Sequence, residues 1–345
     1  MDIYTRNLTA LLALCAALFF ASRRQQDKSS SFSSSSSPSS SSPSSSSPSS
    51  PQNKTPETKT KTEQKRKGHA AFLTVYALVM ASDWLQGPYL YPLYRDFHSL
   101  PSSTISALFT TGFVSGAISG GVVGSWADRY GRKKACTENY GETSTTPNTE
   151  STTKKQPISS ILLSKPVLTL GLASTIFEGS MYLFVFFWTP ALRSVSSSES
   201  DLPYGVIFAC FMAATLASSL AFGMLTSSRR SGTTISQTTL LVTILAGSAT
   251  CFVASARPTS EQTAFWVFCL FEAAVGMYFP CMGSLKGKLV DDGVRAQVYG
   301  MLRVPLNVFV VVSLLVTGGG GDFASVFMVC SGLLATAAGA VRVLL

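Results

Sequence analysis

The sequence predicts an all-α membrane protein, built as a bundle of long apolar helices. Hydrophobic residues make up 46% of its 345 residues and charged residues only 13%, and the mean hydropathy is +0.28. These averages include a Ser-, Pro- and Lys-rich tract between Ser29 and Lys67, so the rest of the chain is more apolar still. A water-soluble domain of this size needs more charge to cover its surface. The apolar residues also gather in runs of about twenty, the length that crosses a hydrocarbon core about 30 Å thick.

Nine such runs are candidate membrane spans. The first is the weakest, because its uninterrupted apolar core runs only from Leu8 to Ala21 and could also be the centre of a signal peptide. We expect an uncleaved anchor with its N-terminus outside, since cleavage would leave the Lys-rich segment 54–67 on the outer side. Lys and Arg of the other predicted loops then fall on the inner side, as the positive-inside rule requires. In chain order the spans are 4–21, 70–94, 104–126, 166–191, 204–226, 237–256, 263–284, 297–317 and 323–344.

Polar segments divide these spans into regions. The tract 29–68 cannot bury enough apolar surface to fold, so we expect a disordered cytoplasmic linker after an N-terminal anchor, residues 1–28. Residues 69–136 form a first group of helices, 137–165 a cytoplasmic loop and 166–345 a six-helix C-terminal region. The cysteines lie mostly inside apolar runs and form no CxxC pair, so we interpret them as packing residues and not as metal ligands or disulfides.

A glycine-spaced charged motif, G-S-W-A-D-R-Y-G-R-K-K, ends the third span at residues 124–134. Its charges are too costly for the bilayer centre, and their positive excess favours the cytoplasmic interface. An ordinary juxtamembrane basic cluster is the alternative, since charge runs usually form solvated faces. The motif resembles the loop between the second and third helices of the major facilitator superfamily and matches it at every fixed position. This resemblance implies a role in gating, and not in substrate binding, for Gly124, Asp128, Arg129, Gly131, Arg132 and Lys133.

Ionisable residues inside the other spans are candidates for the functional site. Each costs at least about 2.5 kcal/mol at a lipid-facing helix centre, so it normally faces a protein interior, a partner charge or a water-filled cavity. A structural ion pair, such as Glu272 with Arg303, is an equally weighted alternative for them. With polar and aromatic neighbours on the same segments, the candidate substrate-binding or coupling residues are Asp83, Gln86, Tyr89, Glu178, Glu272, Tyr278, Arg303 and Asn307.

The segments that carry these residues resemble the molybdate-anion transporter family of the same superfamily. They read D-W-L-Q-G-P-Y-L-Y-P-L-Y, F-E-G-S-M-Y-L-F-V-F-F-W-T-P-A-L, F-E-A-A-V-G-M-Y-F-P and R-V-P-L-N. The resemblance covers about residues 70–136 and 160–345 and implies uptake of molybdate, a tetrahedral dianion similar in shape to sulfate. Arg303 is then the expected counter-charge, because a guanidinium offers several fixed donors to an oxyanion. Asp83, Glu178 and Glu272 could carry coupling protons or hold Arg303 in place.

One departure from the superfamily is large. Its members have two six-helix halves with the substrate site between them. Here the charged motif runs from Cys136 directly into T-E-N-Y-G-E-T-S, which resembles the loop between the halves, so the third to sixth core helices are expected to be missing. The loss of four helices, an even number, leaves the second half in the same orientation across the membrane. The resemblance thus implies a major-facilitator-like helix bundle with an incomplete N-terminal half and a six-helix C-terminal half.

Two functional interpretations remain open. The chain is either a secondary transporter that moves molybdate by alternating access, alone or with another transporter copy, or a non-transporting membrane module that binds or regulates a full-length relative. An enzyme is a distant third, because His69 and His98 are the only histidines and no nucleophile elbow, phosphate loop or metal-ligand spacing occurs. We expect an oxyanion and the lipid bilayer as partners, no nucleic acid and no cofactor. The plasma membrane is the expected location, with an internal membrane as the alternative.

Overall fold

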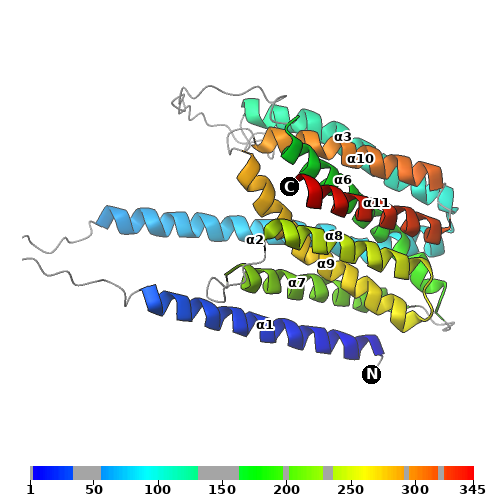
Figure 1. Ribbon diagram of the computed structural model, residues 1–345, viewed down its shortest axis with the longest axis horizontal. Helices are drawn as coiled ribbons and strands as arrows, with labels where there is room; N and C mark the ends of the chain where they lie inside the picture. Colours follow the sequence, from blue (N-terminus) through cyan, green and yellow to red (C-terminus); the bar gives the residue numbers. More distant parts are fainter. Residues whose placement is uncertain are drawn as a thin grey trace, which may run out of the picture.

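The computed structural model is a bundle of long helices (Figure 1). It describes residues 3–33, 56–130, 163–196, 202–227, 236–290, 295–317 and 322–345, and no strand occurs in these ranges. A short π-helix, η1 (Leu93–Phe97), directly follows α2. The α-helices are α1 (Ile3–Ser33), α2 (Pro56–Pro92), α3 (Ser102–Tyr130), α6 (Lys165–Arg193), α7 (Tyr204–Ser227), α8 (Gln237–Ala256), α9 (Glu261–Leu289), α10 (Arg295–Thr317) and α11 (Phe323–Leu344).

Helices α6, α7, α8, α9 and α11 form the centre of the bundle. Helix α9 touches α6, α7 and α8, and α11 closes the group against α6 and α8. Aromatic side chains fill this core, because rings in edge-to-face contact combine a large buried area with favourable ring geometry. The phenylalanines with almost no exposed surface include Phe177, Phe184, Phe211, Phe268 and Phe271. Helix α1 lies along the outer side of α7 (Figure 1).

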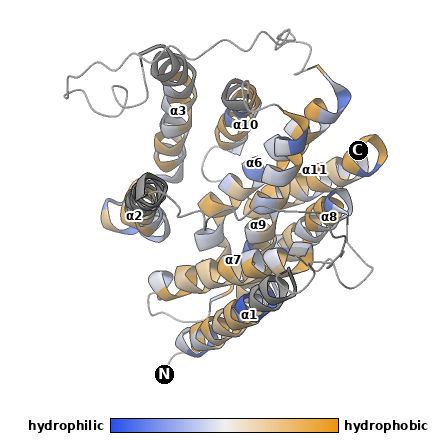
Figure 2. Cartoon of the chain, turned by 90° about the vertical axis from the view of Figure 1, so that its left-hand side faces the viewer, coloured by the Kyte–Doolittle hydropathy of each residue, from blue (hydrophilic) through white to orange (hydrophobic). Residues whose placement is uncertain are grey.

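Helices α2, α3 and α10 lie together along one side of the molecule (Figure 2). Helix α10 packs against α6 and also against α3, so it connects the first group of helices to the central bundle. The Ser106 hydroxyl of α3 donates a hydrogen bond of 2.9 Å to the backbone oxygen of Leu314 on α10. Near the end of α2, Asp96 of η1 accepts two hydrogen bonds, of 2.9 and 2.8 Å, from the Arg193 guanidinium at the end of α6. Both groups of helices are therefore tied together by polar contacts as well as by packing.

Glycines bring two helix pairs unusually close. A Cβ atom on Gly276 of α9 would lie 2.8 Å from the carbonyl carbon of Thr215 on α7, and closer still to its oxygen. A Cβ atom on Gly179 of α6 would lie 2.6 Å from Cε1 of the Phe309 ring on α10. Small residues at such crossings let helices approach closely in a membrane. Gly276 meets backbone, which cannot rotate away, whereas Gly179 meets a side chain that can.

The predicted all-α membrane bundle is confirmed. Within the described residues, seven helices are long and apolar enough to cross a membrane: α1 and α6 to α11. Helices α2 and α3 form where the spans 70–94 and 104–126 were predicted, but they are not among the seven. That these two helices also cross the membrane therefore stays a prediction.

The predicted linker contains helix at both of its ends. Helix α1 continues to Ser33, and α2 begins at Pro56, so residues 29–33 and 56–68 are helical in the structure. Disorder of the linker stays a prediction. The physical reason for the helix at 56–68 is local propensity. Proline is well suited to the first position of a helix, and the Glu, Lys, Gln and Arg residues that follow are strong helix formers that need no packing partner to favour this conformation.

Several predictions fall on residues outside the description. Gly131, Arg132, Lys133 and most of the predicted loop 137–165 lie in the gap between 130 and 163. Gly124, Asp128 and Arg129 lie on the last turns of α3, which continues to Tyr130, beyond the predicted end of the span at 126. The cysteines described by the structure are all buried, as expected of packing residues: Cys15, Cys210, Cys251, Cys269, Cys281 and Cys330.

Candidate functional site

A polar groove opens between α6, α9 and α10. Its volume is about 420 Å³, ample for a tetrahedral oxyanion with its hydration water. The three helices each contribute at least one polar side chain, and apolar side chains fill the rest of the wall. The lining residues are Ser174 and Glu178 of α6, Tyr278, Phe279, Met282, Gly283 and Lys286 of α9, and Tyr299, Gly300, Leu302, Arg303 and Leu306 of α10.

Glu178 lines the groove and lies thirteen residues into α6, about 20 Å from the start of this helix at the usual rise. The Tyr278 hydroxyl donates a hydrogen bond of 3.0 Å to Glu178 Oε1. Tyr278 is itself fixed, because its ring stacks on Phe177 with centroids 3.9 Å apart and has no exposed surface. The position of the carboxylate is therefore set by a rigid aromatic pair.

Two cations share the groove with this carboxylate. Lys286 Nζ lies 4.0 Å from Glu178 Oε1 and 5.6 Å from the centroid of the Tyr299 ring, and the Lys286 side chain is only 15% exposed. Arg303 lies eight residues into α10, about 12 Å from its start. Among the described residues, no hydrogen bond or ion pair engages its guanidinium, which is exposed to the groove. The lining thus carries one more positive than negative charge.

Glu272 lies apart from this groove. It is 6% exposed, and its Oε2 accepts a hydrogen bond of 3.2 Å from the Thr215 hydroxyl across the α7–α9 contact. The same hydroxyl also lies 3.1 Å from the Glu272 backbone oxygen. No ion pair joins Glu272 to Arg303 in the part of the chain that the structure describes, so the structural pair considered from sequence is not formed. Arg303 instead shares its groove with Glu178.

The candidates on α2 are separated from the groove. Gln86 lines another pocket, of about 400 Å³, between α2, η1 and α3. The Tyr89 hydroxyl lies against Gly205 at the start of α7, and the side chain of Asp83 is outside the description. Asn307, one turn after Arg303, is half-buried but is not among the groove residues. Of the eight residues predicted for a site, the structure therefore brings together Glu178, Tyr278 and Arg303.

Sequence reasoning missed Lys286, Tyr299 and Ser174. Lys286 was assigned to a cytoplasmic loop because the predicted span stopped at 284, whereas α9 continues to Leu289. Helical spacing could have found it, since 278, 282 and 286 lie on one face of a helix at intervals of four. The same spacing joins Ser174 to Glu178 and Tyr299 to Arg303.

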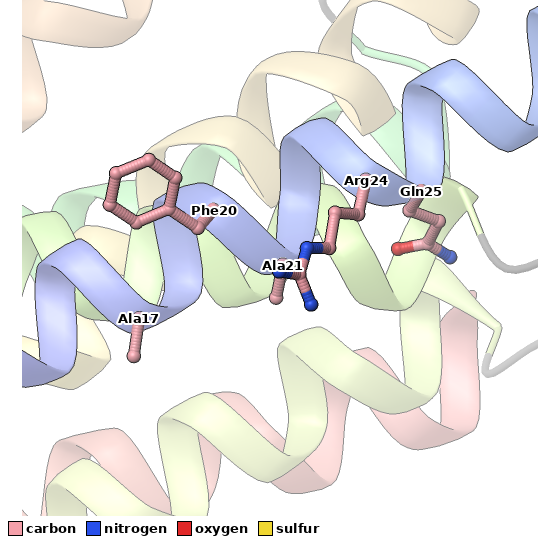
Figure 3. Close-up of a pocket in the computed structure, with 5 residues that line it drawn as sticks. All are labelled: Ala17, Phe20, Ala21, Arg24 and Gln25. Atoms are coloured by element: carbon pink, nitrogen blue, oxygen red, sulfur yellow. The ribbon is translucent and has the colours of Figure 1, made fainter.

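A third pocket, on the surface of α1, does not resemble a ligand site. It has a volume of about 530 Å³, but all its lining residues come from α1: Ala17, Phe20, Ala21, Arg24 and Gln25 (Figure 3). Side chains of one helix cannot surround a ligand, so we interpret it as a depression along the surface of α1. No group of three His, Cys, Asp or Glu side chains that could hold a metal ion occurs within the described ranges.

Comparisons with known proteins agree with a transporter fold. A family of the major facilitator superfamily described as sugar transporters with 12 transmembrane segments matches residues 52–137 and 136–271. These two matched segments cover more than half of the chain, and they meet at residues 136–137, where the sequence departs from the superfamily pattern. No solved structure matches the chain.

Curated relatives named molybdate-anion transporter are similar over part of the chain. The Takifugu rubripes protein is 33% identical over 162 residues, which are 46% of this chain and 32% of that protein. The Xenopus tropicalis protein is 32% identical over 181 residues, 52% of this chain and 38% of that protein. The Danio rerio protein is 31% identical over 190 residues, 51% of this chain and 38% of that protein. The matched part thus spans about a third of these relatives. The family match, which covers more than half of the chain, shows that the chain belongs to this family of the major facilitator superfamily.

Proposed function

We propose that this chain is a membrane transporter of molybdate or a similar tetrahedral oxyanion, and that the groove between α6, α9 and α10 is its substrate site. The observation that carries the proposal is the pair of cations, Lys286 and Arg303, which share one groove with a single carboxylate. A groove that holds more positive than negative charge inside a membrane protein favours an anion as its occupant, and one of its two cations, Lys286, is mostly buried. The relatives named molybdate-anion transporter provide the substrate class.

Each cation has a distinct role in this proposal. The planar guanidinium of Arg303 has no partner among the described residues, so its donors are available to bind two oxygens of one oxyanion at once. The ammonium of Lys286 is a compact charge on a flexible stem, and it can turn from Glu178 toward the anion. Tyr299 supports the ammonium from the other side through its ring.

Alternating access would require the two groups of helices to move relative to each other. Helix α10 carries Arg303 and also packs against α3, which ends in the motif that resembles a gate. We assign Gly124, Asp128, Arg129, Gly131, Arg132 and Lys133 to this gate and not to the substrate site. Asp83, Gln86 and Tyr89 on α2 stay candidates for substrate binding or coupling from the other group of helices.

Molybdate binding to the purified 345-residue chain in lipid nanodiscs tests the site. We expect Arg303→Gln and Lys286→Gln to abolish measurable binding, and Arg303→Lys to weaken it by roughly tenfold to a hundredfold, because a charge-assisted hydrogen bond contributes about 1.5–3 kcal/mol. Lys288→Gln is the matched control. It removes the same charge one half-turn further along α9, where Lys288 bonds to Gln237 at 2.7 Å and lies outside the groove. Wild-type affinity in Arg303→Gln would refute the site.

A second candidate function is a membrane module that binds the anion or a full-length relative but does not transport. Two observations favour it: the chain matches about a third of the length of its relatives, and the family match is divided at 136–137. Uptake of labelled molybdate into proteoliposomes that contain only this chain distinguishes the two functions. Binding with uptake supports the transporter, whereas binding without uptake supports the module.

A further inference from the structure

The proposed oxyanion site already contains an anion of its own, the Glu178 carboxylate. Its Oε1 accepts the hydrogen bond of Tyr278 at 3.0 Å and lies 4.0 Å from Lys286 Nζ. Both members of the ion pair are mostly buried, with side-chain exposures of 15% for Lys286 and 21% for Glu178. A dianion held by Lys286 and Arg303 in the same groove therefore lies beside this carboxylate and competes with it for the ammonium.

The charges that surround Glu178 can be counted helix by helix. Helix α9 contributes Lys286 and Tyr278 to the groove, and α10 contributes Arg303 and Tyr299. Among the described residues, no other ionisable side chain lines it. The empty groove thus carries a net charge of plus one. A bound dianion changes this charge to minus one and places like charges close to the mostly buried Glu178 carboxylate, which disfavours its ionised form.

We infer that Glu178 is the coupling group of the site and takes up one proton when a dianion binds. This inference rests on the proposed function. The proton comes from the aqueous phase and adds to a carboxylate oxygen of Glu178, and no other covalent bond forms or breaks. The loaded groove, with two cations, one dianion and a neutral acid, is then electrically neutral.

The neutral acid also gains a function that the carboxylate lacks. An ionised carboxylate only accepts hydrogen bonds, whereas its protonated form carries an O–H donor. Protonated Glu178 can therefore donate to the bound oxyanion, while the Tyr278 hydroxyl continues to donate to its other oxygen. Proton uptake thus removes the repulsion and adds a donor at the same time, so the proton and the dianion each favour binding of the other.

Isothermal titration of molybdate into the 345-residue chain in nanodiscs tests this inference. Repeating the titration in buffers with different ionisation enthalpies counts the protons taken up per bound anion. At neutral and alkaline pH, where molybdate is a dianion, we expect one proton per molybdate and a Kd that rises about tenfold per pH unit. In Glu178→Gln we expect molybdate still to bind, without proton uptake and with a Kd that no longer depends on pH.

Glu272→Gln is the matched control, because it neutralises the other buried carboxylate of the central bundle, which bonds to Thr215 outside the groove. We expect proton uptake to persist in it. Molybdate binding to the wild-type chain without proton uptake would overturn the inference even if Glu178→Gln failed to fold, and it would leave the proposed function intact. Uptake that persists in Glu178→Gln, or that disappears in Glu272→Gln, would overturn it as well. Absence of molybdate binding to the wild-type chain would overturn both proposals.

Discussion

Replacement of Gly276 by alanine tests the close contact between α7 and α9. The added methyl would lie 2.8 Å from the Thr215 carbonyl carbon, whereas ordinary contacts between carbon atoms begin near 3.5 Å. The obstacle is helix backbone, so the two helices must separate. Overpacking of this kind costs about 1–3 kcal/mol. Separation also lengthens the 3.2 Å hydrogen bond from Thr215 to the buried Glu272 carboxylate, and an unsatisfied buried group costs a further 1–3 kcal/mol or so.

Alanine has a higher helix propensity than glycine by about 1 kcal/mol, which offsets part of this cost. We therefore expect Gly276→Ala to lower the free energy of unfolding by about 1–5 kcal/mol. Unfolding in mixed micelles of mild detergent and SDS, followed by tryptophan fluorescence, measures the change. Gly283→Ala on the same helix is the control, because a Cβ there meets no atom within 4 Å. Equal stability of the two variants would show that α7 and α9 are not in this close contact.

Three further predictions concern the connections between helices and the site. Asp96→Asn breaks the ion pair with Arg193; because the Arg193 and Asp96 side chains are 35% and 42% exposed, we expect a loss of only about 0.5–1 kcal/mol of stabilisation. This loss should appear as a two- to fivefold rise in the labelling of a cysteine placed at the outer end of α6, and unchanged labelling would mean that the pair does not hold this end closed. The double variant Arg303→Gln with Glu272→Gln should bind molybdate no better than Arg303→Gln alone, because these residues form no ion pair. Recovery of binding in the double variant would show that Arg303 serves to neutralise Glu272 and does not bind the anion. Ser106→Ala removes a hydrogen bond between α3 and α10 far from the groove, so we expect an unchanged Kd for molybdate and, wherever uptake is measurable, slower uptake. A large change in Kd would show that α3 affects anion binding in the groove.

The helices were predictable because the bilayer imposes length and composition together. A run of about twenty apolar residues has few alternatives to a helix in hydrocarbon, since every backbone polar group must be satisfied within the segment. Prediction was weaker at helix ends. The predicted span 263–284 stops where Lys286 and Lys288 add charge, but α9 continues to Leu289 because charged side chains do not break a helix. That error of about one turn hid Lys286 from the sequence-based site.

The site was only partly predictable, because an ionisable residue inside a span does not reveal which helix it faces. Glu178 and Arg303 were both expected to be functional, and the structure places them in one groove. Glu272 has the same residue type and a similar setting in the sequence, yet it faces α7 and bonds to Thr215. Only the packing of α9 between α6 and α7 decides that Glu178 lines the groove and Glu272 does not, and this packing depends on contacts between helices distant in the sequence.

Helix α10 links the groove to the first group of helices. All charged groups of the groove lie on α6, α9 and α10, so its excess of positive charge arises within the C-terminal helices. Helix α10 carries Arg303 and, about three turns later, Leu314, whose backbone oxygen accepts the hydrogen bond of Ser106 on α3. Helix α6, which carries Glu178, also contacts α3 through two pairs of aromatic rings. A movement of α3 can therefore reach both Arg303 and Glu178. Under the proposed function we expect the affinity for the anion to depend on the C-terminal helices, and access to the groove to depend on α2 and α3.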